Sequence, residues 1–169
     1  MRKSLVSLAI LASFASAADA ATPLMSAEWA DLACKAWNTN PILTDELAGD
    51  WIKNDQGRGY KIIHMYRTDC GAATKVEMTI SAKDSKALCT YAGKIQHTDL
   101  NSSSDYVMHA ETRRWNEMGA GDYGPMRAMM FGRLKFEGPK MEAMSVMGPF
   151  EQFLLMPGKV PGDAACPGN

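Results

Sequence analysis

The side chains best suited to chemistry in this chain are three histidines and several carboxylates. His64, His97 and His109 are far apart in the sequence. None has a second histidine three or four residues away, the spacing that places two metal ligands on one helical face, and no GxSxG segment marks a nucleophilic serine. The sequence therefore predicts no enzyme activity, no metal site and no cofactor. Four further carboxylates fall in predicted loops or at element ends, where turns and caps explain them: Asp99, Asp105, Glu111 and Asp122.

A glycine-rich segment from Gly119 to Gly124 matches the pattern GxGxxG, and Glu142 follows Asp122 at a distance compatible with a ribose-binding acid. Dinucleotide-binding motifs need a strand before the glycines, within a βαβ unit. A helical pattern precedes them here instead. The segment is therefore interpreted as a break between two helices.

Methionine is unusually frequent, with thirteen residues in the chain. Met141, Met144 and Met147, and likewise Met126 and Met129, recur at the spacing that places side chains on one face of a helix. Thioether arrays bind Cu(I), so an exported copper carrier is one hypothesis. The same spacing describes a filled core, and flexible methionines also suit the wall of a cavity for apolar ligands. With no His or Cys interleaved, the apolar interpretations are favoured.

The first twenty residues are predicted to be a signal peptide. Arg2 and Lys3 precede an apolar run at 5–14 that is too short to span a membrane, and Ala18-Asp19-Ala20 offers a cleavage site. The mature protein is therefore expected from Ala21 onward, in a bacterial periplasm or secreted. The formal net charge of −1, without a basic run, argues against nucleic acid as a partner.

Four cysteines, an even number, are most often disulfide-bonded in an exported chain. They are Cys34, Cys70, Cys89 and Cys166, and no CxxC spacing supports a zinc or redox site. Three pairings are possible, and the sequence does not choose among them. A bridge to Cys166 would attach the Pro/Gly-rich end of the chain, residues 157–169, which is predicted to lack regular structure.

Alternating apolar and polar residues predict five strands. The first is apolar on both faces and is predicted to be an inner strand, and the second and third are expected to form an antiparallel pair around a turn at 83–86. The strands are predicted at 60–67, 75–81, 87–95, 105–110 and 133–137.

Helices are predicted before and after these strands. Ser26 and Thr112 are suitable N-caps, and Pro125 suits the first residue of a helix that Gly132 ends. A last helix is expected to run to Gly148-Pro149 and then resume. This order predicts an α+β domain over residues 21–156, a mainly antiparallel five-stranded sheet covered by helices.

The stretch from 105 to 147 resembles the sterol carrier protein 2 (SCP-2) family. The resemblance includes Asp105-Tyr106, Thr112 with Trp115, Gly121-Asp122, and the run Phe131-Gly132-Arg133-Leu134-Lys135 before Gly138. It implies an SCP-2-like fold with an internal apolar cavity that binds or transfers an apolar lipid, with no chemistry of its own.

The resemblance also implies which residues line the cavity. An apolar lipid is then the expected partner, with a transient membrane contact as a further expectation. The alternatives are a structural or partner-binding module with a filled core, and the copper carrier. The candidate wall residues are Trp115, Met118, Met126, Met129, Met130, Phe131, Leu134, Phe136, Met141 and Met144, with Met147 and Phe150 near the mouth.

Overall fold

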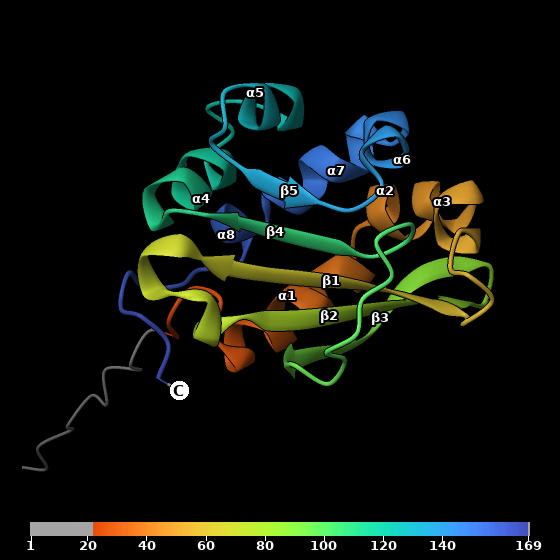
Figure 1. Cartoon of the computed structure of the whole chain (residues 1–169), viewed down its shortest axis with the longest axis horizontal. Coiled ribbons are helices and arrows are strands. Elements are labelled where there is room, and N and C mark those ends of the chain that lie inside the picture. The colour runs from red at the N-terminus through yellow and green to blue at the C-terminus, as the bar shows by residue number, and fades with distance from the viewer. Residues whose placement is uncertain (1–21, 169) are drawn as a thin grey trace, which may run out of the picture.

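The protein has a five-stranded mixed sheet with helices on one face, as the sequence predicts (Figure 1). The computed structural model describes residues 22–168, so the predicted signal peptide at 1–20 lies outside the described residues. The strand order is β3-β2-β1-β4-β5, and only the β1–β4 pair is parallel. The strands are β1 (Tyr60–Arg67), β2 (Val76–Lys83), β3 (Lys86–Lys94), β4 (Tyr106–Ala110) and β5 (Lys135–Glu137).

Strand β1 is the middle strand, which confirms its predicted inner position. It is buried on both faces: Ile63 and Met65 point toward the helices, and Ile62 and His64 point to the other side. The register places Ile63 between Met78 of β2 and Tyr106 of β4. Side chains of three strands therefore meet at this level of the core.

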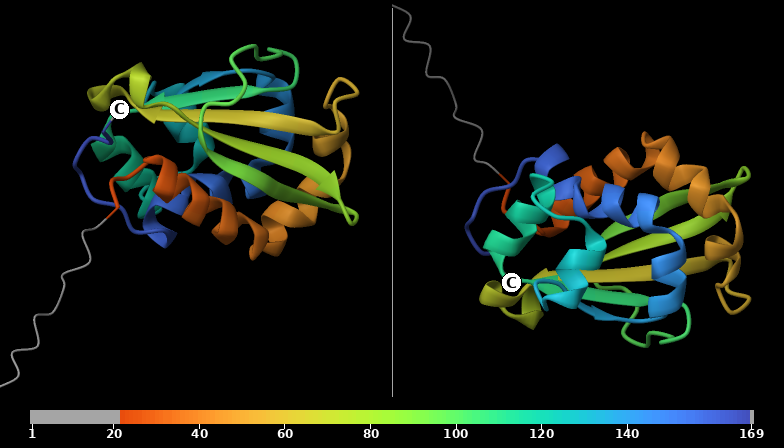
Figure 2. Two further views of the ribbon diagram at one scale, coloured as in Figure 1. Left: turned by 90° about the horizontal axis from the view of Figure 1, so that it is seen from below. Right: turned by 90° about the horizontal axis from the view of Figure 1, so that it is seen from above.

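The helical layer lies on a single face of the sheet, as the two views in Figure 2 show. No helix within residues 22–168 is long and apolar enough to cross a bilayer. The α-helices are α1 (Ala27–Asn38), α2 (Pro41–Thr44), α3 (Asp50–Lys53), α4 (Thr112–Gly119), α5 (Pro125–Met130), α6 (Lys140–Ser145), α7 (Met147–Leu154) and α8 (Met156–Lys159). Three 3-10 turns, η1 (Glu46–Ala48), η2 (Thr68–Cys70) and η3 (Ala72–Thr74), lie between them.

Helix α1 begins where the sequence predicts. The Ser26 hydroxyl accepts a hydrogen bond from the Trp29 amide at 3.1 Å, and this satisfies one of the free N–H groups of the first turn. Buried Trp37 at the other end donates its indole N–H to the Ala87 carbonyl, 2.8 Å away on β3. The helix is therefore fixed at both ends.

The opposite face of the sheet is covered by the loop between β3 and β4 (Figure 1). Its amides at Gln96 and His97 donate to the fully buried carboxylate of Glu77 at 3.0 and 2.9 Å. The other end of the loop is held by Asp105, whose carboxylate binds Arg58 at 2.6 Å and accepts from the Ile62 amide. Asp105 therefore stabilises the end of a loop, in agreement with the structural role that the sequence predicts for it.

The cysteines pair as Cys34–Cys89 and Cys70–Cys166. The second bridge attaches the C-terminal segment beside η2, where the Arg67 guanidinium also donates to the carbonyls of Asp163 and Ala165. The prediction that 157–169 lacks regular structure is wrong at its start, because α8 continues to Lys159.

Gly132 ends α5 as predicted, with a φ of +64°. The Gly132 amide donates to Met129 and the Arg133 amide donates to Ala128, the two hydrogen bonds of a Schellman motif. The Leu134 amide also donates to Ala128. These turn contacts delay β5, so the strand predicted from 133 begins at Lys135.

Two other helix boundaries differ from the predictions. The break in the late helix falls at Val146 rather than at Gly148-Pro149, because Pro149 lies in the first turn of α7, where a missing N–H costs no hydrogen bond. Thr112 is not the N-cap of α4. Its amide and hydroxyl instead donate to the Asp69 carboxylate at 2.9 and 2.7 Å.

The carboxylate of Glu77 should make stability depend on pH. Burial raises its pKa, but hydrogen bonds from His97, Gln96 and His64 outweigh burial and hold the pKa below its ordinary value. This contribution is therefore present above about pH 4.5 and is lost as the pH falls through the lowered pKa. We expect Glu77→Gln to lower the unfolding free energy at pH 7 by about 1–3 kcal/mol.

Urea unfolding followed by circular dichroism at pH 7 and at pH 3 measures this difference. The gap between wild type and Glu77→Gln should narrow at pH 3, because protonated glutamate resembles glutamine. Glu151→Gln, on the exposed side of α7, is the control. A gap that stays constant with pH would show that the charge of Glu77 is not what stabilises the loop.

Candidate lipid-binding cavity

An apolar cavity lies between the sheet and the helices. The sheet forms its floor, α7 and the end of α6 form its roof, and residues of α1, η1 and α3 close one side. The cavity encloses about 40 Å³. Its lining consists of Trp37, Leu47, Trp51, Ile63, Tyr106, Met108, Phe136, Ala143, Val146, Pro149, Phe150 and Phe153.

In this state the cavity has room for small molecules only. An apolar cavity of ~150 Å³ is the size that holds benzene, so an acyl chain or sterol ring requires the walls to move apart. The α6 end of the roof is weakly packed, since Ala143 is the only buried residue of this helix. Ala143 and Val146 both line the cavity, so an outward shift of α6 would enlarge it.

A buried polar cluster closes one end of the cavity. Lys61 on β1 has a fully buried side chain, and its ammonium contacts the Glu142 carboxylate of α6 at 2.6 Å and the Trp51 carbonyl at 3.1 Å. The Tyr106 hydroxyl donates to the same Glu142 oxygen, and it accepts from the Trp51 indole N–H at 2.9 Å. Asn54 donates to the other Glu142 oxygen at 2.8 Å.

Aromatic rings join the cluster to the apolar cavity. The Trp51 and Tyr106 rings stack with centroids 6.0 Å apart, and the Lys61 ammonium lies 4.4 and 5.1 Å from these two centroids. Both rings are also part of the cavity wall. Cation–π attraction stabilises an ammonium in such a place.

Burial controls the ionisation of the cluster. It lowers the pKa of Lys61, and hydrogen bonding to Glu142 partly opposes that effect. Burial also raises the pKa of the Tyr106 hydroxyl, and the neighbouring Glu142 carboxylate raises it further. Tyr106 therefore stays protonated and keeps its capacity to donate a hydrogen bond.

The twelve predicted wall residues do not all meet at this cavity. Phe136 and Phe150 line it. Four others, Trp115, Met118, Met129 and Leu134, are buried or half-buried elsewhere in the core, and Met147 is half-buried at the start of α7. These five residues therefore contribute to packing outside the cavity.

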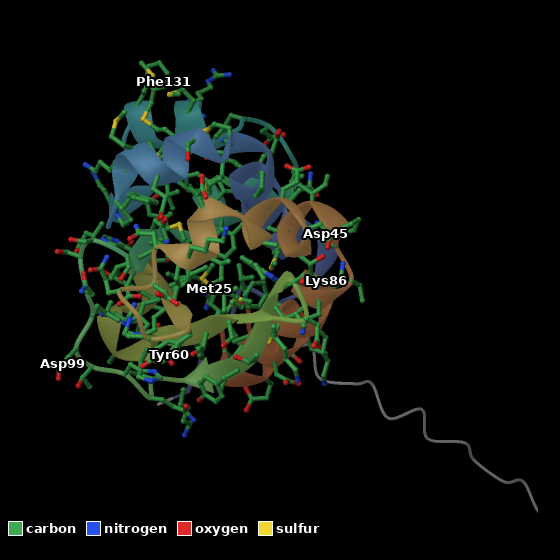
Figure 3. All side chains as sticks on the ribbon, turned by 90° about the vertical axis from the view of Figure 1, so that its right-hand side faces the viewer. Met25, Asp45, Tyr60, Lys86, Asp99 and Phe131 are labelled. Atoms are coloured by element: carbon green, nitrogen blue, oxygen red, sulfur yellow. A yellow bond between two sulfur atoms is a disulfide. The ribbon has the colours of Figure 1, made fainter. Side chains whose placement is uncertain are left out.

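Five predicted wall residues are exposed instead. Their exposed fractions run from 41% for Met126 and Met144 to 68% for Phe131, 74% for Met130 and 78% for Met141. Figure 3 shows Phe131 at an extremity of the molecule, at the opposite end from Tyr60. Met130 and Phe131 lie beside the Schellman turn that ends α5, and none of the five lines the cavity in this structure, so their contact with a lipid stays a prediction.

The predicted methionine array is also divided. Met141 and Met144 lie on α6, while Met147 begins α7 after the break at Val146, so the three do not share one helical face. Within residues 22–168, no group of three or more His, Cys, Asp or Glu side chains is arranged to hold a metal ion. The copper hypothesis thus loses its three-methionine array, while Met126 and Met129 keep their spacing on α5.

Sequence reasoning missed the contribution of the N-terminal half to the cavity. Trp37, Leu47 and Trp51 come from three separate elements, α1, η1 and α3, whose sequence patterns give no sign of a shared wall. The sequence did indicate that Lys61 is buried, because this lysine alternates with apolar residues in a strand predicted to be buried on both faces. A buried lysine requires a partner, and that requirement points to a carboxylate elsewhere in the chain.

The other chemical candidates have structural roles. Gly119 ends α4 and Gly124 precedes α5, so the GxGxxG segment is the helix break that the sequence predicts. Among the histidines, His64 and His97 both donate to Glu77, at 3.2 and 2.7 Å. His109 on β4 is hydrogen-bonded to Thr68 of η2.

Comparison with known proteins identifies the architecture. The profile of the SCP-2 sterol transfer family matches residues 61–151, more than half of the chain. The chain belongs to the SCP-2 family. The expected resemblance is confirmed, and SCP-2 domains are a fold for lipid binding and transfer. No curated protein matches the chain.

Solved structures support the SCP-2 fold. A crystal structure of sterol carrier protein 2 superimposes with a TM-score of 0.50 and 16% identity, covering 81% of this chain and 98% of that one. A conserved hypothetical protein from Thermus thermophilus gives a TM-score of 0.48 and 17% identity, covering 86% and 94%. We base the fold assignment on the first of these.

The cavity wall can be tested through stability. Phe150 is buried and contacts Phe136 with ring centroids 5.7 Å apart, so Phe150→Ala should lower the unfolding free energy by about 3–5 kcal/mol. Met130→Ala, at an exposed site, should change it by less than about 0.5 kcal/mol. Urea unfolding measures both, and a small loss at Phe150 would mean that the roof is not packed on the sheet.

Proposed function

We propose that this SCP-2 protein binds or transfers an apolar lipid, such as a sterol or fatty acid, in the periplasm, and that it carries out no reaction on the ligand. The observation that carries the proposal is the apolar cavity between the sheet and α7, bounded by a thinly anchored helix. Family membership supports the same ligand class. Each buried CH₂ group of a ligand contributes about 0.8 kcal/mol, so ten methylenes suffice for useful affinity.

Two features of the chain support the periplasmic part of the proposal. Two disulfides join distant segments of the described chain, and such bridges persist in oxidising compartments. The sequence of residues 1–20 has the three regions of a signal peptide.

Ligand binding can be measured directly on protein purified from the periplasmic fraction. Native mass spectrometry should show a chain that begins at Ala21 with a bound lipid, which solvent extraction then identifies. The purified protein should also bind a fluorescent fatty acid. Repeated recovery of an empty chain that binds no such probe would contradict the proposal. The remaining interpretation would then be a structural or partner-binding module with a filled core.

A variant that fills the cavity tests whether the lipid binds there. Ala143→Leu puts a larger side chain into the lining and should reduce binding of the probe at least about tenfold, at a stability cost of about 1–3 kcal/mol. Met144→Leu, on the exposed side of the same helix, is the matched control and should bind normally. Equal binding by both variants would place the ligand elsewhere.

We further propose that the exposed end of α5 contacts an anionic membrane during lipid exchange. Between Tyr123 and Phe136 the chain has three cations, Arg127, Arg133 and Lys135, and no acid. Within residues 22–168 these three make no salt bridge. Exposed apolar side chains bordered by cations suit the interface of an anionic bilayer.

Vesicle co-sedimentation tests the membrane contact. We expect binding to phosphatidylglycerol-containing vesicles, weaker binding to pure phosphatidylcholine, and loss of binding as salt rises. The double variant Met130→Ser/Phe131→Ser should bind several-fold more weakly. Leu32→Ser removes an apolar side chain of 43% exposure on α1 and is the control. Equal effects of both changes would contradict this surface.

A further inference from the structure

The buried ammonium of Lys61 is the most unusual feature at the cavity. Lysine is almost never fully buried without a partner, because removing its charge from water is costly. In the described chain its one salt-bridge partner is Glu142. The pair is not isolated in the core: the Trp51 and Tyr106 rings that flank the ammonium also face the apolar cavity.

The Glu142 carboxylate comes from a thinly anchored element. Helix α6 has six residues, no side-chain cap at Pro139 and one buried side chain, while Met141 on its outer side is 78% exposed. Its polar attachment to the rest of the fold is through Glu142, which accepts from Lys61, Tyr106 and Asn54. The carboxylate thus acts as a latch that holds α6 against the sheet.

The latch and the cavity wall move together. Glu142 is next to Ala143 in the chain, and Ala143 and Val146 line the cavity. Any outward shift of α6 that widens the cavity therefore also withdraws the carboxylate from Lys61. An uncompensated buried ammonium is strongly unfavourable, so an open cavity favours a ligand that brings a negative charge to the same place.

We propose that the cavity binds a fatty acid, whose carboxylate replaces that of Glu142 at Lys61 and Tyr106 while its chain occupies the space between the sheet and α7. This inference rests on the proposed function and gives it a substrate class. The two aromatic rings set the direction of the chain, since they connect the ammonium to the apolar lining around Phe150 and Phe153. A neutral ligand of equal length leaves Lys61 unpaired.

The test compares dodecanoic acid with 1-dodecanol, which share the chain and differ in charge. Displacement of a fluorescent probe from the wild-type protein at pH 8 should show the acid binding at least about tenfold more tightly. Lys61→Met should abolish this preference, because no ammonium is left to be paired by the acid or left unpaired by the alcohol. Lys86→Met, which removes a half-exposed partner of Asp45, is the control and should keep the preference.

A second variant covers the case in which Lys61→Met does not fold. Glu142→Gln removes the internal competitor and keeps the shape, so it should bind dodecanoic acid more tightly than the wild type does and should keep the preference for the acid over the alcohol. An unchanged or weaker affinity for the acid overturns the inference.

The outcomes separate the inference from the proposed function. A wild-type protein that binds acid and alcohol equally, with no effect of Lys61→Met, overturns the fatty-acid inference and leaves lipid binding intact. A wild-type protein that binds neither compound, nor any lipid recovered by extraction, overturns both.

Discussion

The positive charge of Lys61, placed inside the protein, constrains much of the surrounding structure. An ammonium in the interior must be compensated by an opposite charge and by hydrogen bonds, or it destabilises the fold by several kcal/mol. Here Glu142 supplies the charge, and the Trp51 carbonyl accepts a further hydrogen bond. The strand, two aromatic rings and helix α6 are therefore positioned relative to one another by one electrostatic requirement.

Buried carboxylates are held in different ways on the two faces of the sheet. On the outer face, Glu77 and Asp105 accept hydrogen bonds from a loop whose ends they fix, and each faces a neighbouring basic side chain. On the helical face, the Glu142 carboxylate belongs to a short helix with little apolar packing. The first arrangement attaches the loop to the sheet at both of its ends, whereas the second attaches α6 to the sheet through one carboxylate.

Much of the fold followed from local patterns, because alternation and turn chemistry act over a few residues. The alternation of Val76, Met78 and Ile80 identified β2, and the glycine at 132 identified the end of α5. The cavity did not follow in the same way. Met130 and Phe131 have the same spacing whether they face a core or solvent, and only the direction taken by the chain after the Schellman turn decides between the two.

The wall of the cavity depends on contacts between distant segments. Trp37 and Leu47 meet Phe150 and Phe153 from the other end of the chain, and no local pattern encodes that meeting. Lys61 is the exception, since its place in a strand buried on both faces implies a partner without naming it. The sequence thus indicated that one end of the cavity is polar. The partner of Lys61, Glu142, could be identified only from the structure.

The two disulfides have a consequence for how far the cavity can open. The Cys34–Cys89 bridge spans 55 residues and the Cys70–Cys166 bridge spans 96, and the two covalent rings overlap in sequence. Lys61 lies in the first ring and Glu142 in the second. If α6 moves outward as proposed, it therefore lies between β5 and a C-terminal segment that is covalently fixed beside η2, which limits how far this part of the chain can move away from the sheet.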